Sequence, residues 1–209
     1  AEQVKTAPEF ERTRENMNEF GGCAIAGKAV RTALSQLMGK FTDTQVTGRL
    51  TSIMKKINLE DGTEARGYRK VEISTQRNYL TGFEFNKNQS INGVFNAPYQ
   101  VNHDPARNTA DLIVEEFLPV ELIAAPAGAS HFRLLHALAV IADFSYNPVT
   151  GTYEPDDAVN NELSVVSRSP FIPLNESYSG DTITADLPGL PTLDNTVSVL
   201  QCIGIEFFQ

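Results

Sequence analysis

The three histidines are the first residues to test for chemistry, because imidazole serves both as a metal ligand and as a general base. His131 and His136 are five positions apart in an apolar run, so on a strand they point to opposite faces and cannot share a metal ion. His103 stands beside Asp104 in a segment with the composition of a loop. We expect each histidine to be an ordinary core or surface residue, and we expect no metal site.

Sequence motifs for catalysis or cofactor binding are missing from the chain. It contains no Gly-x-Ser-x-Gly, His-Glu-x-x-His, Cys-x-x-Cys, phosphate-loop or dinucleotide-binding motif. Glu115 and Glu116 are adjacent on an expected strand and point to opposite faces, so they do not form a catalytic pair. We expect that the protein is not an enzyme, that it has no catalytic residues and that it uses no cofactor.

The loop around Asp156 and Asp157 is rich in oxygen atoms that could bind calcium. Glu154, Asn160 and Asn161 lie near these aspartates, and Ca²⁺ prefers such ligands. The spacing lacks the register of an EF-hand, so a solvated loop is the alternative. Aromatic residues could add a surface for glycans or for a partner, although the chain has no Trp: Tyr146, Tyr153, Phe171, Tyr178, Phe207 and Phe208.

The net charge of −9 is unevenly distributed along the chain. Residues 1–105 contain 14 Lys and Arg against 12 Asp and Glu, whereas residues 106–209 contain 3 against 14. Nucleic acids are bound by clustered basic residues, so we expect no nucleic-acid partner. Copies of a chain with such unequal halves attract one another head to tail, within a screening length of about 10 Å.

Cys23 and Cys202 are the only two cysteines, which excludes a disulfide scaffold. Both stand among apolar neighbours, which favours buried free thiols, and a disulfide between them is the alternative. The apolar run after Ser130 is shorter than the roughly 20 residues of a membrane-spanning helix, so we expect no membrane insertion. The chain begins without an apolar leader, so we expect no signal peptide. The sequence does not fix the compartment, and an extracellular or cell-surface location is the working hypothesis.

Residues 1–62 have the pattern of a helical region. Capping boxes are expected at Thr6 to Glu9 and at Thr42 to Gln45, since a hydroxyl is followed three residues later by Glu or Gln. Apolar residues then recur at helical spacing from Val46 to Ile57, which predicts an amphipathic helix that covers the sheet. Gly21-Gly22 is expected to interrupt the first helix, because each glycine costs about 1 kcal/mol relative to alanine.

Residues 67–209 are predicted to form a β-rich domain with frequent turns. The most apolar stretch, Val120 to Phe144, is broken at Ala125 to Gly128, so we expect a core strand over Ser130–Ala142 and a final strand over Val197–Phe208. The other expected strands are Tyr68–Ile73, Thr81–Phe85, Ile91–Phe95, Leu112–Phe117, Leu163–Val166 and Asp181–Ala185. This pattern predicts an α+β fold, mainly β, in which two or three N-terminal helices pack on an antiparallel β-sandwich or barrel.

Four motifs resemble a family of uncharacterised small proteins from Bacteroidota. They are P-E-F-E-R-T-R-E-N-x-x-E-F-G (Pro8 to Gly21), A-G-K-A-V-R-T-A-L (Ala26 to Leu34), A-A-P-A-G-A-S-H-F (Ala124 to Phe132) and G-I-E-F-F-Q (Gly204 to Gln209). Members of that family carry a short basic, β-prone segment before the first motif, so the resemblance implies that this chain is trimmed or observed in part at its start. It implies no activity and no catalytic residues.

These observations favour a structural subunit that assembles with copies of itself, as a component of a filament, tube or shell. The missing reactive site, the unequal halves and the apolar last strand all point to homo-oligomeric protein–protein contacts. The alternative is a ligand-binding or adhesive β-sandwich module, for a glycan or calcium, that uses the loop Asn147 to Asn161. The residues expected at an interface are apolar and lie in the last strand and the first helix: Ile203, Ile205, Phe207, Phe208, Phe10 and Phe20.

Overall fold

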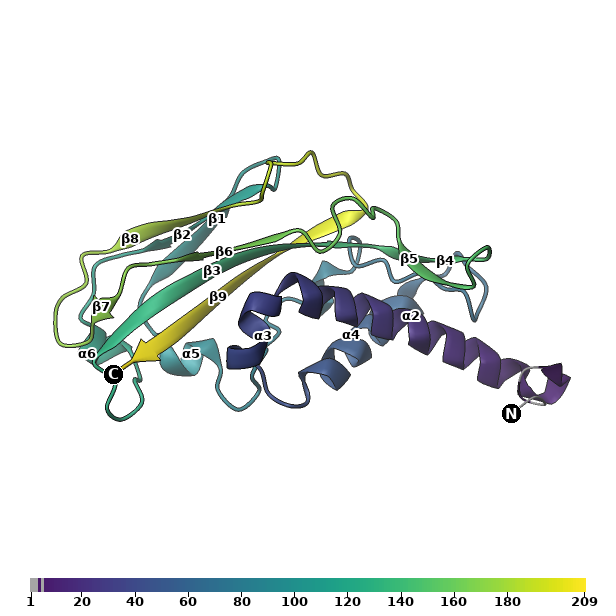
Figure 1. Ribbon diagram of the computed structural model, residues 1–209, viewed down its shortest axis with the longest axis horizontal. Helices are drawn as coiled ribbons and strands as arrows, with labels where there is room; N and C mark the ends of the chain where they lie inside the picture. The colour runs from purple at the N-terminus through teal and green to yellow at the C-terminus, as the bar shows by residue number, and fades with distance from the viewer. Residues whose placement is uncertain (1–3, 5) are drawn as a thin grey trace.

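The structure is a computed structural model that describes Val4 and residues 6–209 in three layers. One antiparallel sheet forms the upper layer of Figure 1, a second antiparallel sheet lies beneath it, and the helices form the lower layer. Helix and strand each account for 30% of the chain. The expected α+β class, with N-terminal helices packed on antiparallel sheet, is confirmed. The equal shares of helix and strand correct the expectation of a mainly β chain, and both sheets are open, so they do not form a barrel.

The middle layer is built around the long strand β3 (His131–Ala142), where the sequence predicted the core strand. Strand β9 (Val197–Phe208) has the expected bounds and pairs with β3 along its whole length, while β6 (Ser164–Arg168) and β7 (Ile172–Pro173) pair with the other side of β3. The upper sheet has the order β1-β2-β8. Its strands are β1 (Tyr99–His103), β2 (Thr109–Val114) and β8 (Asp181–Asp186), and a separate hairpin joins β4 (Phe144–Asn147) to β5 (Thr152–Pro155).

The lower layer contains α2 (Glu11–Ala33), α3 (Ser35–Phe41) and α4 (Val46–Glu60), after a short 3₁₀ turn, η1 (Pro8–Phe10). The predicted amphipathic helix is confirmed as α4, but the expectation that it covers the sheet is corrected, because it packs mainly on α2. Both expected capping boxes are wrong, because Ala7 caps η1 and Gln45 caps α4, each without a side-chain hydrogen bond.

The glycine pair does not interrupt the first helix, which corrects the sequence prediction. Helix α2 runs through Gly21 and Gly22, and Gly22 is buried against the aromatic ring of Tyr153. A Cβ atom on Gly22 would lie 2.5 Å from Cγ of Tyr153, whereas a Cβ on Gly21 would meet nothing within 4 Å. The close approach of the tyrosine ring therefore explains why position 22 has no side chain, although glycine is a poor helix former.

Alanine substitutions at these two glycines should have opposite effects on stability. Gly21→Ala should raise the free energy of unfolding by up to about 1 kcal/mol, since alanine loses less backbone entropy in a helix. Gly22→Ala should lower it by about 1–3 kcal/mol, because Tyr153 is buried and must shift. Urea unfolding followed by circular dichroism would measure both changes, and a stable Gly22→Ala protein would contradict the close contact.

The segment between α4 and β1 also departs from the sequence prediction. The expected strands Tyr68–Ile73, Thr81–Phe85 and Ile91–Phe95 are turns, the 3₁₀ helix η2 (Arg77–Tyr79) and the short helix α5 (Ile91–Val94). Val71 makes one isolated bridge to Phe144. The alternating apolar residues of this segment pack one by one into the core cluster that contains α2 and α4. Their spacing is that of a strand, but they form no ladder of backbone hydrogen bonds.

The two faces of β3 bury different cores. Ala137, Ala139 and Ile141 face the helices and join a cluster with α2 and α4. The alternate residues, such as Leu134 and Leu138, face the upper sheet. The helical region and the β-rich region therefore share a core through the middle layer.

One arginine ties the upper sheet to the start of β9. Arg107 lies in the turn between β1 and β2 with a φ of 63°, a backbone conformation unusual for a residue other than glycine. Its guanidinium donates hydrogen bonds to the carbonyl oxygens of Val197 (2.9 Å), Leu193 (3.1 Å) and Asp194 (2.5 Å). This clamp places the β1–β2 turn beside the first residue of β9.

Candidate docking edge along the last strand

Strand β9 is the edge of the middle sheet, although it is as long as the central strand β3. Ten of the last eleven residues of β3, from Leu134 to Ala142 together with Phe132, are buried, whereas only Val197 and Ser198 of β9 are buried. The remaining residues of β9 are half-buried. Both faces of β9 are covered by other layers, so the exposure comes from its open side.

The hydrogen bonds of β3 show which backbone groups of β9 remain free. Val140 donates to the carbonyl of Leu163 (2.8 Å), and the carbonyl of Leu134 accepts from Ser169 (3.0 Å), so even-numbered residues of β3 face β6. Odd-numbered residues of β3 consequently face β9, because backbone direction alternates along a strand. Leu135 is paired with Gly204, so the even-numbered residues of β9 are the ones that bond to β3.

The odd-numbered residues of β9 therefore direct their N–H and C=O groups toward the open side. Within the described part of the chain, no backbone hydrogen bond engages these groups. Free backbone groups of this kind form a template for another strand. The residues concerned are Val199, Gln201, Ile203, Ile205 and Phe207.

A groove of about 920 Å³ runs along this edge and is lined by every residue from Ser198 to Phe208. The stretch from Val199 to Ile205 has no charged side chain. At the end of the groove, Glu206 pairs with Arg133 (2.5 Å) and with Lys40 (3.6 Å). Further apolar walls come from α3 and from the segment before α5: Leu37, Met38, Phe41, Leu80, Phe83 and Phe85.

Strand β1 is a second open edge and it lies on the same side of the molecule. All five of its residues are exposed, although Tyr99 and Val101 pair with the buried residues Val114 and Leu112. Directly paired residues point to the same face of a sheet, so Tyr99 and Val101 belong to the inner face, which looks toward the middle layer. Their exposure shows that no strand of the described chain covers them, and Tyr99 also lines the groove beside β9. We therefore take β1 to extend beyond β9.

The opposite side of the two stacked sheets is closed. Strands β6 and β8 contact each other there, and Leu163 and Val165 join Ala185 and Leu187 in one apolar cluster. The stack therefore has one closed side and one open side, and the open side carries both β1 and β9.

The six expected interface residues do not form a single surface. Ile203, Ile205 and Phe207 are half-buried against the upper sheet, as expected for one face of the last strand. Phe208 packs edge-on against Phe171, with the ring centroids 4.7 Å apart. Phe10 and Phe20 lie in η1 and α2, toward the N-terminal end of the molecule, which is far from the C-terminus in Figure 1.

The histidines and cysteines are where ordinary core chemistry would place them. His136 is buried, and Nδ1 lies 2.7 Å from the carbonyl oxygen of Ile183, with Nε2 2.9 Å from the side-chain amide of Gln201. Burial lowers the pKa of His136. Cys23 and Cys202 are free thiols, as favoured from the sequence, and burial raises the pKa of each to about 12.

The acidic loop already uses its oxygen atoms internally. Asp157 accepts hydrogen bonds from the backbone of Val159 and from Asn160, and Glu154 accepts from Asn147 and Thr150. Across the described ranges, no group of three or more His, Cys, Asp or Glu side chains is arranged to hold a metal ion.

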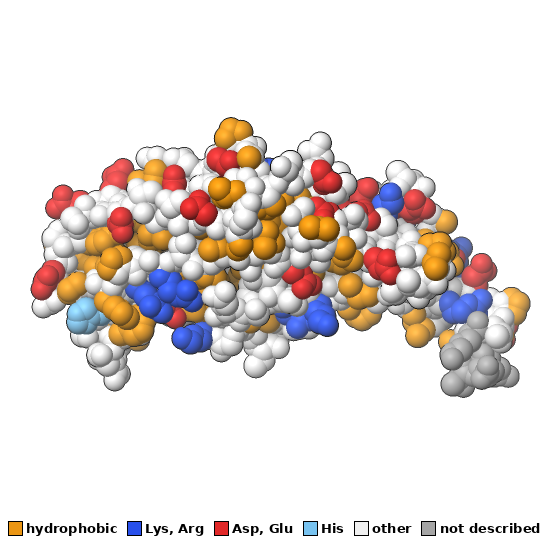
Figure 2. All heavy atoms as spheres, turned by 45° about the horizontal axis from the view of Figure 1, so that its top comes forward, with side chains coloured by type: hydrophobic (Ala, Val, Ile, Leu, Met, Phe, Trp, Pro, Cys, Tyr) orange, Lys and Arg blue, Asp and Glu red, His pale blue; other side chains and the backbone are white. Residues whose placement is uncertain are grey.

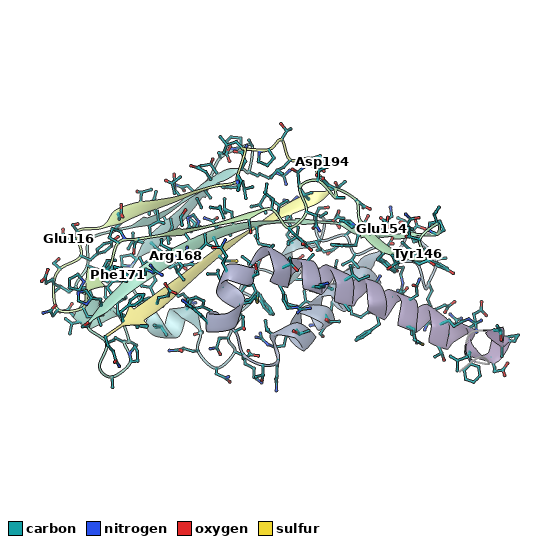
Figure 3. All side chains as sticks on the ribbon, viewed as in Figure 1. Glu116, Tyr146, Glu154, Arg168, Phe171 and Asp194 are labelled. Atoms are coloured by element: carbon teal, nitrogen blue, oxygen red, sulfur yellow. The ribbon has the colours of Figure 1, made fainter. Side chains whose placement is uncertain are left out.

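The aromatic residues do not form one platform. Tyr153 and Tyr178 are buried. Figure 3 shows Tyr146 at the β4–β5 end of the molecule and Phe171 at the other end. A broad aromatic surface for glycans is therefore not assembled from these residues.

Charge is distributed unequally between the layers. In Figure 2 the acidic side chains of the visible face lie mainly along its upper part, and the basic ones lie mainly along its lower part.

Among the described residues, no helix is both long and apolar enough to cross a membrane. Sequence reasoning named β9 as an assembly strand but missed β1, since Y-Q-V-N-H is short and its alternation contains only two apolar residues, Tyr99 and Val101. No protein-family model, curated protein or solved structure matches this chain.

Proposed function

We propose that this protein is a structural subunit that assembles with copies of itself through protein–protein contacts, as a component of a filament, tube or shell. The observation that carries the proposal is the open edge of β9, where five residues offer free backbone groups inside an apolar groove. Natural sheet edges are usually short, charged or covered, whereas this edge is long and its centre is uncharged. An edge of this kind is suited to a permanent partner. We also propose that the chain belongs with the Bacteroidota family that its four motifs resemble.

The mass of the purified protein in solution tests this proposal. Light scattering and negative-stain microscopy at micromolar concentration should show particles that are multiples of the 22.9 kDa subunit. Ile203→Lys should weaken association by at least about tenfold, because it places a charge on the half-buried inner face of β9, and circular dichroism would confirm that this variant is folded. Val159→Lys is the matched control, since Val159 is 90% exposed in a distant loop. A lone 22.9 kDa species at every salt concentration would exclude the proposal.

A ligand-binding or adhesive module is the second candidate. The groove volume lies within the range of roughly 300–1,000 Å³ for small-molecule sites, and the buried hydroxyl of Ser198 on its wall has no hydrogen-bond partner within the described chain. Glycan arrays and calorimetry with calcium test the glycan and calcium forms of this candidate. If neither experiment detects binding, the glycan-binding and calcium-binding hypotheses are excluded.

A further inference from the structure

We propose that two copies join by a two-fold axis at their open sides, so that β1 of each copy pairs with β9 of the other. This inference rests on the proposed function and names the partner of the same edge. The middle sheet of one copy would continue into the upper sheet of the other, and both open edges would be closed in one step. Two-fold contacts of this kind are the commonest among soluble oligomers.

The free backbone groups of the two edges match in direction, and the three outward residues of β1 can pair with three of the five on β9. The N–H of Asp104 donates to the carbonyl of Thr109 (3.0 Å), so the even-numbered residues of β1 bond to β2. The odd-numbered residues Tyr99, Val101 and His103 then direct their N–H and C=O groups outward. Each can exchange two hydrogen bonds with an odd-numbered residue of β9, for example Val101 of one copy with Ile203 of the other.

The side chains agree with this pairing independently. Residues that exchange both hydrogen bonds carry their side chains on the same face of a sheet. Ile203 and Ile205 point between the two sheets, and Tyr99 and Val101 also lie on an inner face. On both strands the residues with outward backbone groups are also the ones whose side chains point to the inner face. A shift of either strand by one residue would place the side chains of the paired residues on opposite faces.

The strand directions are also suitable. The turn after β1 is held at the start of β9 by Arg107, whereas α5, just before β1, packs near Ile203 and Ile205. Strand β1 therefore runs antiparallel to β9 within one copy. A two-fold axis along the strands keeps this direction, so β1 of the second copy is antiparallel to β9 of the first.

Because β1 extends beyond β9, it covers the place where a partner strand would pair with β9, and β1 of a second copy fits that place. The position next to β9 lies beneath β1, so a strand placed there is covered by Tyr99 and Val101 on its inner face. In the proposed dimer that strand is β1 of the second copy, and the exposed Tyr99 and Val101 of both copies cover one another. Direct pairing of β9 with β9 fails, because β1 of one copy would collide with β2 of the other.

The charges of the two copies favour the same arrangement. The outer face of the upper sheet carries Asp111 and Asp186, and it would lie beside the helical layer of the other copy. That layer carries the exposed side chain of Lys40, which also pairs with Glu206, and the segment that forms the groove wall contains Arg77, Lys87 and the acidic Glu84, so basic side chains are in excess there. Opposite charges across a rim mainly increase the association rate and the specificity.

Proline substitutions on the two open edges test the pairing. Val101→Pro and Ile203→Pro each remove one outward N–H without removing a donor from the existing ladders to β2 or β3. Each variant alone should raise the dimer dissociation constant by about 100-fold or more, because both ladders of its dimer contain the proline. The conservative variants Val101→Thr and Ile203→Val keep the N–H and should dimerise like the wild type. Circular dichroism and thermal unfolding confirm that each variant is folded.

Mixing the two proline variants gives a sharper result. A mixed dimer contains one ladder with both prolines and one intact ladder, so it should bind more tightly than either variant binds to itself. Sedimentation velocity on the separate and mixed proteins would show this complementation. Equal association in all three samples would overturn the inference.

Hydrogen exchange on the wild-type protein provides a test that needs no substitution. The outward N–H groups of Tyr99, Val101 and His103, and those of their partners Ile205, Ile203 and Gln201, should exchange slowly in the concentrated protein and quickly after dilution. Assembly that persists while these groups stay unprotected would overturn the inference but leave the proposed function in place. A protein that never assembles would contradict both.

Discussion

Replacement of Glu19 by Gln should lower the free energy of unfolding by about 3 kcal/mol, since two cations would lose their buried anion. The Glu19 side chain is fully buried in α2. Its carboxylate accepts hydrogen bonds from Arg69 (2.8 and 3.0 Å), from Lys55 (2.5 Å) and from the N–H of Gly67 (2.8 Å). These contacts join α2 to α4 and to the turn that follows α4.

The same residue should govern stability in acid. Burial by itself raises the pKa of Glu19, but the hydrogen bonds from Arg69, Lys55 and Gly67 outweigh burial and lower the pKa from 4.5 to about 2. A lowered pKa means that the folded protein binds the proton less readily than the unfolded chain. The stabilisation is therefore complete above pH 4.5 and is lost as the pH falls toward 2.

Urea unfolding at several pH values would measure both effects. The difference in stability between wild type and Glu19→Gln should be greatest near neutral pH and should shrink below pH 4.5. Glu15→Gln is the control, because Glu15 pairs with Arg12 and Arg66 at the surface, where a pair contributes about 1 kcal/mol or less. Equal effects of the two substitutions would show that the buried cluster does not stabilise the fold.

Replacement of Phe132 by Ala should cost about 3–5 kcal/mol, because it leaves a cavity where β3 meets the upper sheet. Phe132 is fully buried, with its ring centroid 6.3 Å from that of Phe117, and it is paired with Phe207 on β9. Denaturant unfolding would give the loss directly.

Phe171→Ala is the control for Phe132→Ala, because Phe171 lies at the surface and Phe132 lies in the core. Phe171 is 58% exposed and touches Phe208 and Arg133, so Phe171→Ala should cost less than about 1 kcal/mol. If both substitutions cost the same, the two sheets would not be joined by the cluster around Phe132.

The parts of the fold that could be predicted are those with a strong local pattern. Strand β9 has its expected bounds, and α4 follows its apolar stripe from Val46 to Ile57. The segment around Val71 and Ile73 misled the prediction, because single buried side chains in turns alternate like a strand. Gly22 misled it as well, because this glycine makes room for Tyr153, which lies far away in the sequence, and does not end the helix.

The open edge of the middle sheet, strand β9, could be predicted only in part. The sequence marks both β3 and β9 as long apolar strands, and nothing local states which of them lies at the edge. That distinction depends on strand order, which is a property of contacts between distant segments. The overhang of β1 is a property of how two sheets are stacked, so it becomes visible only in three dimensions.

The Arg107 clamp has a further consequence for any association at the open side. Three hydrogen bonds from one guanidinium fasten the β1–β2 turn to the residues that lead into β9. The two edges are consequently held at a fixed offset before a partner arrives. A preorganised surface loses less conformational freedom when it binds, so this single side chain, bonded to the residue just before the groove, would increase the affinity of the subunit for its partner.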